Sequence, residues 1–526
     1  MGRFAKFTNS IFPFLHRRGS LILLVLFWGI VALAPFGKGQ LSNLRDLALA
    51  FILIGFLAQI ASPLHQGRLR FRLIALAVLW LIFSGLAALS VARVHDEFLF
   101  RQSLEPPLLF CISLFLLLVS IDYMKSRNFS RHALLPAYLF AAIAILFFFS
   151  ALLSPLAHVS LRFLYREGGL YIPIAQILYL ELLKKPDIRK WLRPFVYVGL
   201  AMSVLTIIIF FIGLFGDFET RIWLEQKEWI RFDYLGDFDR PWRVQFPFEH
   251  HNRMASFNLL ICFITLGWFA QRLHKGKGFF WTWLALLPAM AILVSKTRGA
   301  YVALVAGLFC IVIALLLDRI QTRRQKHTPK AKPAKPLRKA LLLWGIPLVL
   351  LLSFLSIPGP RHQVKSILNP RTYIEKRGSL GLRFAAWQAG WDLTCDNPIW
   401  GVGYGSEVFE RIYETRYMDM LDDPEKKPHA HNNYLEIAAE SGIPVLLVFL
   451  GLNAFVLLGL WNRRKQFHAY PNIALIGLLG AIHAYGMVNY SLRQSIGLLI
   501  WGLLAIMAAQ AIDHPEKESE DKAHGL

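Results

Sequence analysis

The stretch HAHNNYLEIAAESGIPVLLVFLGLNAFVLLGLW, residues 429–461, joins a polar cluster to a long apolar run. Two histidines, two amides and a carboxylate lie within His429–Glu436, and the apolar run begins at Ile443. A run of this length is typical of a helix that crosses a bilayer. The polar cluster therefore lies where the chain enters a membrane, either as a functional site or as a solvated loop with an interfacial tyrosine.

The rest of the chain is similarly apolar. Hydrophobic residues make up 56% of its 526 residues, and the mean hydropathy is +0.46. Soluble domains are less apolar than this, and the apolar runs of roughly 18 to 22 residues are long enough to cross a hydrocarbon core. The four cysteines form no CxxC motif, so neither a disulfide framework nor a zinc site is indicated. The sequence predicts an all-α, polytopic helical membrane bundle.

The apolar runs predict about fourteen spans, with limits accurate to a few residues. They are 19–36, 46–63, 73–92, 106–124, 134–157, 168–184, 194–215, 254–271, 279–295, 299–318, 340–357, 442–461, 472–490 and 494–512. The N-terminus is basic and then apolar, without a clear small-residue cleavage site. We therefore interpret Leu21–Ala34 as part of a retained first span and not as a signal peptide.

The loops between these spans alternate in charge. With both termini on the cytoplasmic side, every short inside loop is basic, whereas the short outside loops 37–45 and 93–105 are nearly neutral. This is the positive-inside pattern of membrane proteins. Much of the formal net charge of +23 therefore faces anionic lipid of the inner leaflet, and nucleic acid is not needed to explain it.

The same pattern divides the chain into six parts. They are membrane helices one to ten at 1–318, which include an outer loop at 216–253; a basic cytoplasmic linker at 319–339; an eleventh helix at 340–357; a large, partly helical outer loop at 358–441; helices twelve to fourteen at 442–512; and a cytoplasmic tail at 513–526. The linker is rich in proline, lysine and arginine, so we expect disorder and contact with the membrane surface.

Three polar stretches share the outer face: 216–253, the tight link Ser295–Gly299 and 358–441. Arg298 and Lys296 in the link must bind an anion or serve as interfacial anchors. A guanidinium can bind phosphate through two hydrogen bonds, and Gly299 would let a ligand approach the backbone closely. The link is therefore a candidate phosphate clamp.

The end of the first outer loop, RPWRVQFPFEHHNR at 240–253, concentrates basic residues next to the membrane. This favours a local anion site that includes Arg243. The adjacent His250 and His251 suggest a metal only weakly, because no third ligand follows at a standard spacing.

The second outer loop contains an apolar stripe. Leu380, Phe384, Trp387 and Trp391 recur at helical spacing, which predicts an amphipathic helix at the interface, with Arg383 near its start. The glycines of GVGYG at 401–405 are not a dinucleotide-binding signal, since no βαβ context surrounds them.

Several further polar residues have a structural and a functional interpretation. His431 can act as a general base, because an ordinary imidazole accepts a proton near neutral pH, or it can be a hydrogen-bonded residue at a helix start. His483 and Asn489 are interpreted as packing or helix–helix hydrogen-bonding groups. Arg493 is interpreted first as an interfacial anchor and second as a phosphate ligand.

Taken in order, these motifs resemble the O-antigen ligase and O-antigen polymerase superfamily. The resemblance is carried by SKTRGAYVAL (295–304), SLGLRFAAWQAGWDLTCDNPIWGVGYG (379–405) and HAHNNYLEIAAESGIPVLL (429–447). RVQFPFEHHNRMASFNLL (243–260) is similar to the family's arginine- and asparagine-containing stretch before a span, although the family commonly has a small residue or proline where His251 stands. The resemblance covers roughly residues 240 to 450.

The resemblance implies an inverting glycosyltransferase of lipopolysaccharide biosynthesis in the bacterial inner membrane, with its site facing the periplasm and no metal or cofactor. The donor would be an undecaprenyl-diphosphate-linked glycan, and the acceptor a sugar hydroxyl of the lipid A core oligosaccharide. Carried over by position, the catalytic base is His431; the diphosphate ligands are Arg243, Arg298 and Arg383; and candidate helpers are His429, Asn432, Lys296 and Trp387.

Two alternatives stay open. An O-antigen polymerase or a protein O-oligosaccharyltransferase of the same superfamily shares the motifs but uses another acceptor. A polytopic transporter or flippase is a different class, which predicts charges within spans and inverted repeats. The spans contain few central charges and no evident repeat, whereas the polar groups gather on one face, which favours an enzyme.

Overall fold

The protein is described by a computed structural model, which covers residues 131–164, 169, 171–184, 188–232, 242–246, 248, 250–274, 284, 286–325, 378–417, 429–465 and 469–512. The first four predicted spans, the predicted eleventh span at 340–357 and the tail at 513–526 lie outside these residues.

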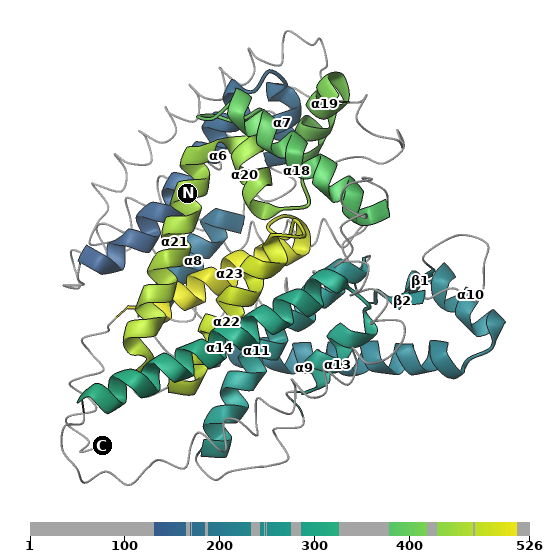
Figure 1. Ribbon diagram of the computed structural model, residues 1–526, viewed down its shortest axis with the longest axis vertical. Coiled ribbons are helices and arrows are strands. Elements are labelled where there is room, and N and C mark those ends of the chain that lie inside the picture. Colours follow the sequence, from purple (N-terminus) through teal and green to yellow (C-terminus); the bar gives the residue numbers. More distant parts are fainter. Residues whose placement is uncertain are drawn as a thin grey trace, which may run out of the picture.

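Nearly all of the described chain is helical (Figure 1). The elements before the basic linker are η3 (Arg131–Leu134), α6 (Leu135–Leu153), α7 (Ala157–Leu164), α8 (Tyr171–Lys184), α9 (Ile188–Phe215), α10 (Phe218–Gln226), β1 (Ile230–Phe232), β2 (Trp242–Val244), α11 (His251–His274), α13 (Leu286–Val294) and α14 (Arg298–Gln325). Those after it are α18 (Gly378–Asp396), α19 (Ser406–Tyr417), α20 (Asn433–Ser441), α21 (Ile443–Asn462), η6 (Arg463–Lys465), α22 (Ala469–Gly486) and α23 (Gln494–Gln510).

Five of these helices are long and apolar enough to cross a membrane: His132–Leu153, Trp191–Phe215, His251–Arg272, Arg298–Gln321 and Ile443–Asn462. Each coincides with a predicted span. Three shorter apolar helices, Tyr171–Leu183, Pro471–Gly486 and Ile496–Gln510, coincide with three more. Within the described residues the structure thus agrees with a multi-span bundle.

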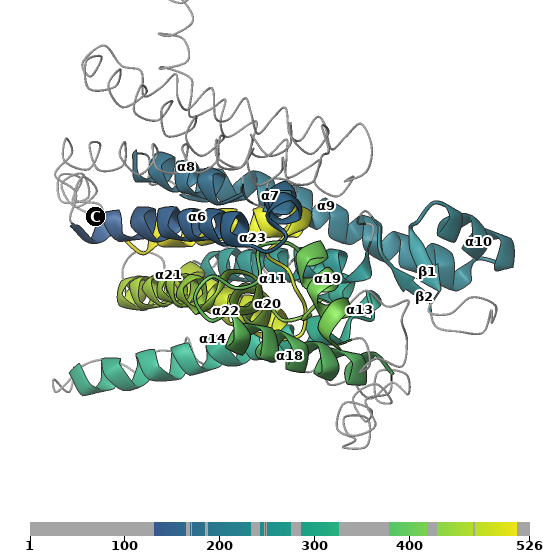
Figure 2. The same ribbon diagram turned by 90° about the horizontal axis from the view of Figure 1, so that it is seen from above.

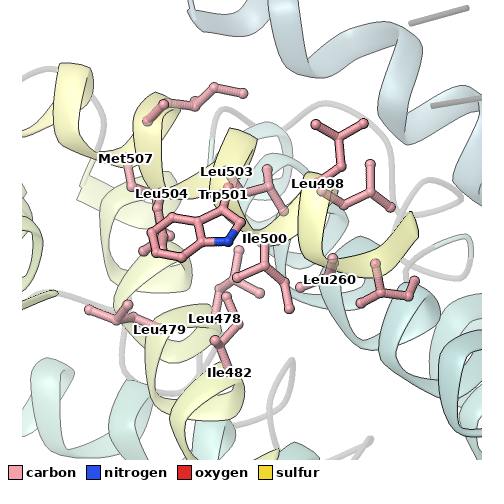
Figure 3. Packing of buried hydrophobic residues seen from close by; sticks show 14 of the residues in the cluster. Leu260, Leu478, Leu479, Ile482, Leu498, Ile500, Trp501, Leu503, Leu504 and Met507 are labelled. Carbon is pink, nitrogen blue, oxygen red and sulfur yellow. The ribbon is translucent and has the colours of Figure 1, made fainter. Parts of the chain in front are cut away.

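The centre of the bundle is formed by α22 and α23. Helix α22 packs against α11 and α14, and α23 packs against α8. Figure 3 shows the indole of Trp501 on α23 among aliphatic side chains, with Leu478 and Ile482 of α22 nearby. Its ring centroid also lies 6.4 Å from that of Phe140 on α6 and 5.7 Å from that of Phe449 on α21. One buried aromatic residue therefore joins four helices.

Small residues allow α14 and α22 to approach closely. A Cβ placed on Gly307 of α14 would lie 2.6 Å from the carbonyl oxygen of Gly477 on α22. Glycine at such contacts is typical of helices that pack in a membrane, where van der Waals contact replaces the hydrophobic driving force. This tight pair places the start of α14 beside the end of α22, and both ends carry site residues.

Helices α18, α19 and α20 gather with α7 at one end of the bundle (Figure 1). The turn between α18 and α19 is seated on α6 and α7 by two serines: Ser154 Oγ donates to the Val402 carbonyl at 2.6 Å, and Ser160 Oγ donates to the Tyr404 carbonyl at 2.7 Å. Gly403 has a φ of +116°, and a Cβ there would lie 2.2 Å from Ser154 Oγ. The glycines predicted as a turn thus permit close packing of backbone on helix.

The structure departs from the predictions at two places. The first outer loop is not all-α, because β1 and β2 form a short antiparallel ribbon in which Arg231 lies opposite Arg243. With α10, this ribbon projects to one side of the bundle (Figure 2). Helix α14 continues to Gln325, so the first part of the segment predicted as linker 319–339 is helical.

On α18, two residues of the predicted apolar stripe face away from the protein, as expected of an amphipathic helix at the membrane interface. Phe384 and Trp391 are exposed, whereas the small residues Ala385, Ala386 and Ala389 are buried. Because the protein-facing side is made of small residues, α18 packs closely on α20 and leaves its aromatic residues outward, which suits an interface with lipid.

The junction between α20 and α21 gives a test of this packing. Gly442 has a φ of +86°, and a Cβ there would lie 2.0 Å from the Ile399 carbonyl oxygen. We expect Gly442→Ala to destabilise the protein by more than about 1 kcal/mol, because alanine resists a positive φ and meets backbone atoms. Thermal unfolding in detergent measures this loss. Gly451→Ala on α21 is the control, since nothing lies within 4 Å of its Cβ position; an equal loss in both variants would contradict this account.

Candidate functional site

The HAH segment forms a tight turn that leads into α20. Asn432 is the N-cap of this helix, and its side-chain oxygen accepts hydrogen bonds from the backbone N–H groups of Tyr434 and Leu435 at 2.9 and 3.2 Å. His431 has a φ of +46°, in the left-handed region that non-glycine residues rarely adopt. Surrounding contacts must hold such a conformation.

A buried carboxylate holds the residue before His431. Glu436 on the first turn of α20 is fully buried, and its Oε2 accepts a hydrogen bond of 2.7 Å from the backbone N–H of Ala430. The ring of His429 lies 3.8 Å from that of His431, and its Nδ1 accepts a hydrogen bond of 3.4 Å from the His431 N–H. The turn is therefore fixed on both sides of Ala430.

Arg493, which lies between α22 and α23, is the cation beside two buried carboxylates beneath this turn. Its guanidinium forms an ion pair with Glu440, one helical turn after Glu436, and lies 3.9 Å from Glu436 Oε1. Its Cζ also lies 4.6 Å from the ring centroid of Tyr404 and 4.7 Å from that of Tyr490. All three charged side chains are almost completely buried. Arg493 is thus not the interfacial anchor that the sequence suggested, because two buried carboxylates draw it into the protein.

His431 and its neighbours line a cavity of about 250 Å³. Its walls come from the start of α11, the start of α19, the HAH turn, and the connection between α22 and α23. Burial, with smaller contributions from the charges of His429, Arg383 and His250, lowers the pKa of His431 to about 2. His431 is therefore unprotonated at physiological pH, as a general base must be before it accepts a proton.

Arg243 reaches this region from β2. Its Nη1 lies 3.0 Å from Nε2 of His251, and the ring of His251 stacks on that of His250 with centroids 4.2 Å apart. Burial, together with the charges of Arg253, Arg231 and Arg243, lowers the pKa of His250 to about 4. Several cations thus act on one pair of neutral imidazoles.

The link between α13 and α14 joins the ribbon to the bundle. Lys296, which has a φ of +51°, donates a hydrogen bond of 2.8 Å from Nζ to the Trp242 carbonyl. Its Nζ also lies 5.2 Å from the centroid of the Trp242 ring. Lys296 therefore fixes the residue next to Arg243, and Arg298 follows as the first residue of α14.

Asn489 connects the remaining arginine to the cluster. Its Oδ1 accepts hydrogen bonds from Arg383 Nη2 at 3.4 Å and from Asn252 Nδ2 at 3.3 Å. A Cβ on Gly299 would lie 2.6 Å from its Nδ2, so the start of α14 touches the same amide. Burial lowers the pKa of Arg383, and the nearby positive charge of Arg298 also lowers it. The interaction with Tyr485 raises this pKa. Asn489 thus connects Arg383 to the start of α14, where Arg298 lies.

The predicted site residues thus come together from distant parts of the chain. The positive charge of Arg383 interacts electrostatically with His431. The charges of Arg243 and Arg383 both interact electrostatically with the ring of His251. Of the candidate helpers, His429 contacts His431 with the two rings tilted by 41°, whereas Asn432 and Lys296 make structural contacts. Trp387, half-buried on α18, has an indole N–H without a hydrogen-bond partner in the part of the chain that the structure describes.

Sequence reasoning missed the residues that hold these groups in place. Glu436 was seen only as one member of a polar cluster, and Glu440 was not singled out. Their spacing of four residues on an otherwise apolar helix was the available signal, since it places both carboxylates on one face. Asn489 was expected to form hydrogen bonds between helices, and it does so between α18 and α11 through its side chain.

Comparison with protein families adds an independent finding. Residues 283–450 match the family described as O-antigen ligase. Over these residues the chain is similar to an O-antigen ligase domain. The match supports the resemblance carried by the motifs, and the matched segment includes Arg298, Arg383 and His431, whereas Arg243 precedes it. Comparison with curated proteins gave no match.

The match to that domain and the candidate spans together identify a multi-pass membrane protein. In the described ranges, no group of three histidine, cysteine, aspartate or glutamate side chains could hold a metal ion.

The buried ion network beneath the HAH turn yields a stability prediction. Arg493→Met should cost about 3 to 5 kcal/mol, because it leaves two carboxylates buried without their cation. Arg411→Met is the control, since Arg411 is half exposed and pairs with Glu407 on the surface, where an ion pair contributes about 0 to 1 kcal/mol. Thermal unfolding of both variants in detergent measures the difference, and similar losses would contradict a buried network.

Proposed function

We propose that this protein is an inverting, metal-independent glycosyltransferase of the O-antigen ligase type. It moves a glycan from undecaprenyl diphosphate to a sugar hydroxyl of the lipid A core, on the periplasmic side of the bacterial inner membrane. The observation that carries the proposal is a chain of neighbouring cations that leads to His431: Arg383 acts on His431, and Arg298 acts on Arg383. Arg243 contacts His251, on which the charge of Arg383 also acts.

The arginines suit a diphosphate leaving group. Guanidinium groups bind phosphate oxygens through paired hydrogen bonds, and fixed positive charge stabilises the charge that develops as the glycosidic bond breaks. The carboxylates of α20 do not neutralise this cluster, because Glu436 and Glu440 are bound to Arg493, Ala430 and Gly405. These two carboxylates therefore have partners of their own.

His431 supplies the base for the same reaction. Its unprotonated ring nitrogen takes the proton of the acceptor hydroxyl, and the hydroxyl oxygen attacks the anomeric carbon of the donor sugar. The bond from that carbon to the diphosphate breaks, and undecaprenyl diphosphate leaves with the electron pair. Attack opposite the leaving group inverts the configuration at the anomeric carbon.

The related activities use the same residues. An O-antigen polymerase or a protein O-oligosaccharyltransferase would share the arginines and the base and would differ in the acceptor. A transporter is less well supported, because the polar residues described above gather where helix ends meet: at the starts of α11, α14, α20 and α23 and at the ends of α13 and α22.

The base assignment is tested by His431→Ala. Transfer from purified undecaprenyl-linked glycan to lipid A core should fall by about 10² to 10⁴, the usual contribution of general base catalysis. Product formation with lipid A core, free glycan and peptide supplied separately also identifies the acceptor. His132→Ala on η3 is the control. Full transfer by the His431 variant would exclude it as the base, and absence of transfer by the wild type to any acceptor would refute the proposed function.

The diphosphate site is tested by Arg298→Lys. The ammonium keeps the charge but loses the planar pair of donors, so we expect kcat/KM for the donor to fall about tenfold or more. Arg411→Lys, on the exposed face of α19, controls for the general effect of the substitution. Steady-state kinetics with varied donor measures the change, and unchanged kinetics in Arg298→Lys would argue against a bidentate contact.

A further inference from the structure

The end of α22 brings two buried polar side chains to the elements that carry the arginines. Tyr485 and Asn489 are four residues apart, and the Asn489 N–H donates a hydrogen bond of 3.0 Å to the Tyr485 carbonyl. The turn therefore extends to Asn489, and the two side chains lie on one face. Both residues are almost completely buried, so their polar groups need partners within the protein.

The first element that these two residues contact is the start of α11. Tyr485 Oη donates a hydrogen bond of 2.7 Å to the Asn252 carbonyl. Asn252 Nδ2 in turn donates one of 3.3 Å to Asn489 Oδ1. Asn252 is therefore held by its backbone and by its side chain, directly after His251, which contacts Arg243.

The second and third elements are α18 and α14. Asn489 Oδ1 accepts a further hydrogen bond of 3.4 Å from Arg383 Nη2, so both lone pairs of this oxygen have donors. Tyr485 also interacts electrostatically with Arg383. A Cβ on Gly299 would lie 2.6 Å from Asn489 Nδ2, which places the amide against the residue that follows Arg298. One amide thus contacts three elements that are distant in sequence.

The chemistry of an amide suits this position. The Arg383 side chain has many rotamers, and the nearby charge of Arg298 disfavours a position beside the start of α14. A hydrogen-bond acceptor is therefore needed to hold the guanidinium there. A carboxylate would hold it but would also neutralise its charge, whereas the uncharged oxygen of Asn489 orients the guanidinium and leaves its charge available to an anion.

We infer that Asn489 is a positioning residue, whose side-chain oxygen holds the Arg383 guanidinium beside the start of α14 for binding of the donor diphosphate. The inference rests on the proposed function, because it assigns a role in binding the donor of that reaction. Asn489 acts through Arg383, and it lies outside the segment 283–450 that matches the ligase family.

A double-mutant cycle on binding tests the inference. The dissociation constant of undecaprenyl diphosphate is measured for the wild type, Asn489→Ala, Arg383→Ala and the double variant. We expect Asn489→Ala to raise the dissociation constant about tenfold, because a hydrogen bond to a charged group is lost. In the Arg383→Ala background, the same substitution should change it less than about twofold, since the group that Asn489 positions is already absent.

Asn472→Ala is the matched control. Asn472 is also a buried amide of this hairpin, and it hydrogen-bonds through both side-chain atoms, to the Arg463 carbonyl and to Gln510 Nε2, at the other end of α22. We expect its dissociation constant to stay within about twofold of that of the wild type. Equal effects of Asn489→Ala in both backgrounds, no effect of it in either, or an equal effect of Asn472→Ala would each overturn the inference.

Thermal unfolding and size-exclusion chromatography establish that each variant is folded. If Asn489→Ala does not fold, Asn489→Ser takes its place in the cycle, because serine keeps a buried hydroxyl but is too short to reach Arg383. Binding requires no turnover, so the two proposals can fail separately. A wild type that binds undecaprenyl diphosphate and transfers no glycan would refute the proposed function alone, whereas a wild type that does not bind it would refute both.

Discussion

The ion network of Arg493 with Glu436 and Glu440 is the interaction on which the arrangement of the site depends. Charged groups removed from water are costly unless they are paired and hydrogen-bonded, so removal of any partner leaves an uncompensated charge. Here the pairing joins the α22–α23 connection to α20, and Glu440 Oε2 also accepts a hydrogen bond of 3.2 Å from the Gly405 N–H. The turn that carries His431 is therefore fixed to three separate parts of the chain.

The positive φ of His431 is held by the contacts on both sides of it. Such a backbone conformation costs about 1 to 3 kcal/mol and persists only where surrounding contacts fix it. Before His431, the Ala430 N–H donates to Glu436, and after it the Asn432 side chain caps α20.

The sequence predicted the described spans of the bundle, because apolar run length and loop charge are local signals. They placed Arg298 and His431 on one face, and the motifs then identified the domain. The same signals could not predict that Arg493 is buried. An arginine at the end of an apolar run is typical of an interfacial anchor, and its buried partners are not evident from the sequence. They also missed the pairing of Arg231 with Arg243, because strands of three residues carry too little periodicity to be recognised.

The central claim is that a diphosphate binds among the arginines with His431 beside the anomeric carbon of the donor. The most direct measurement is an experimental structure of the His431→Ala variant with bound undecaprenyl-linked glycan. The account predicts that the diphosphate contacts the guanidinium groups of Arg298 and Arg383, with the first sugar facing the position of the missing imidazole. A diphosphate bound elsewhere, with these arginines distant from its oxygens, would contradict the account.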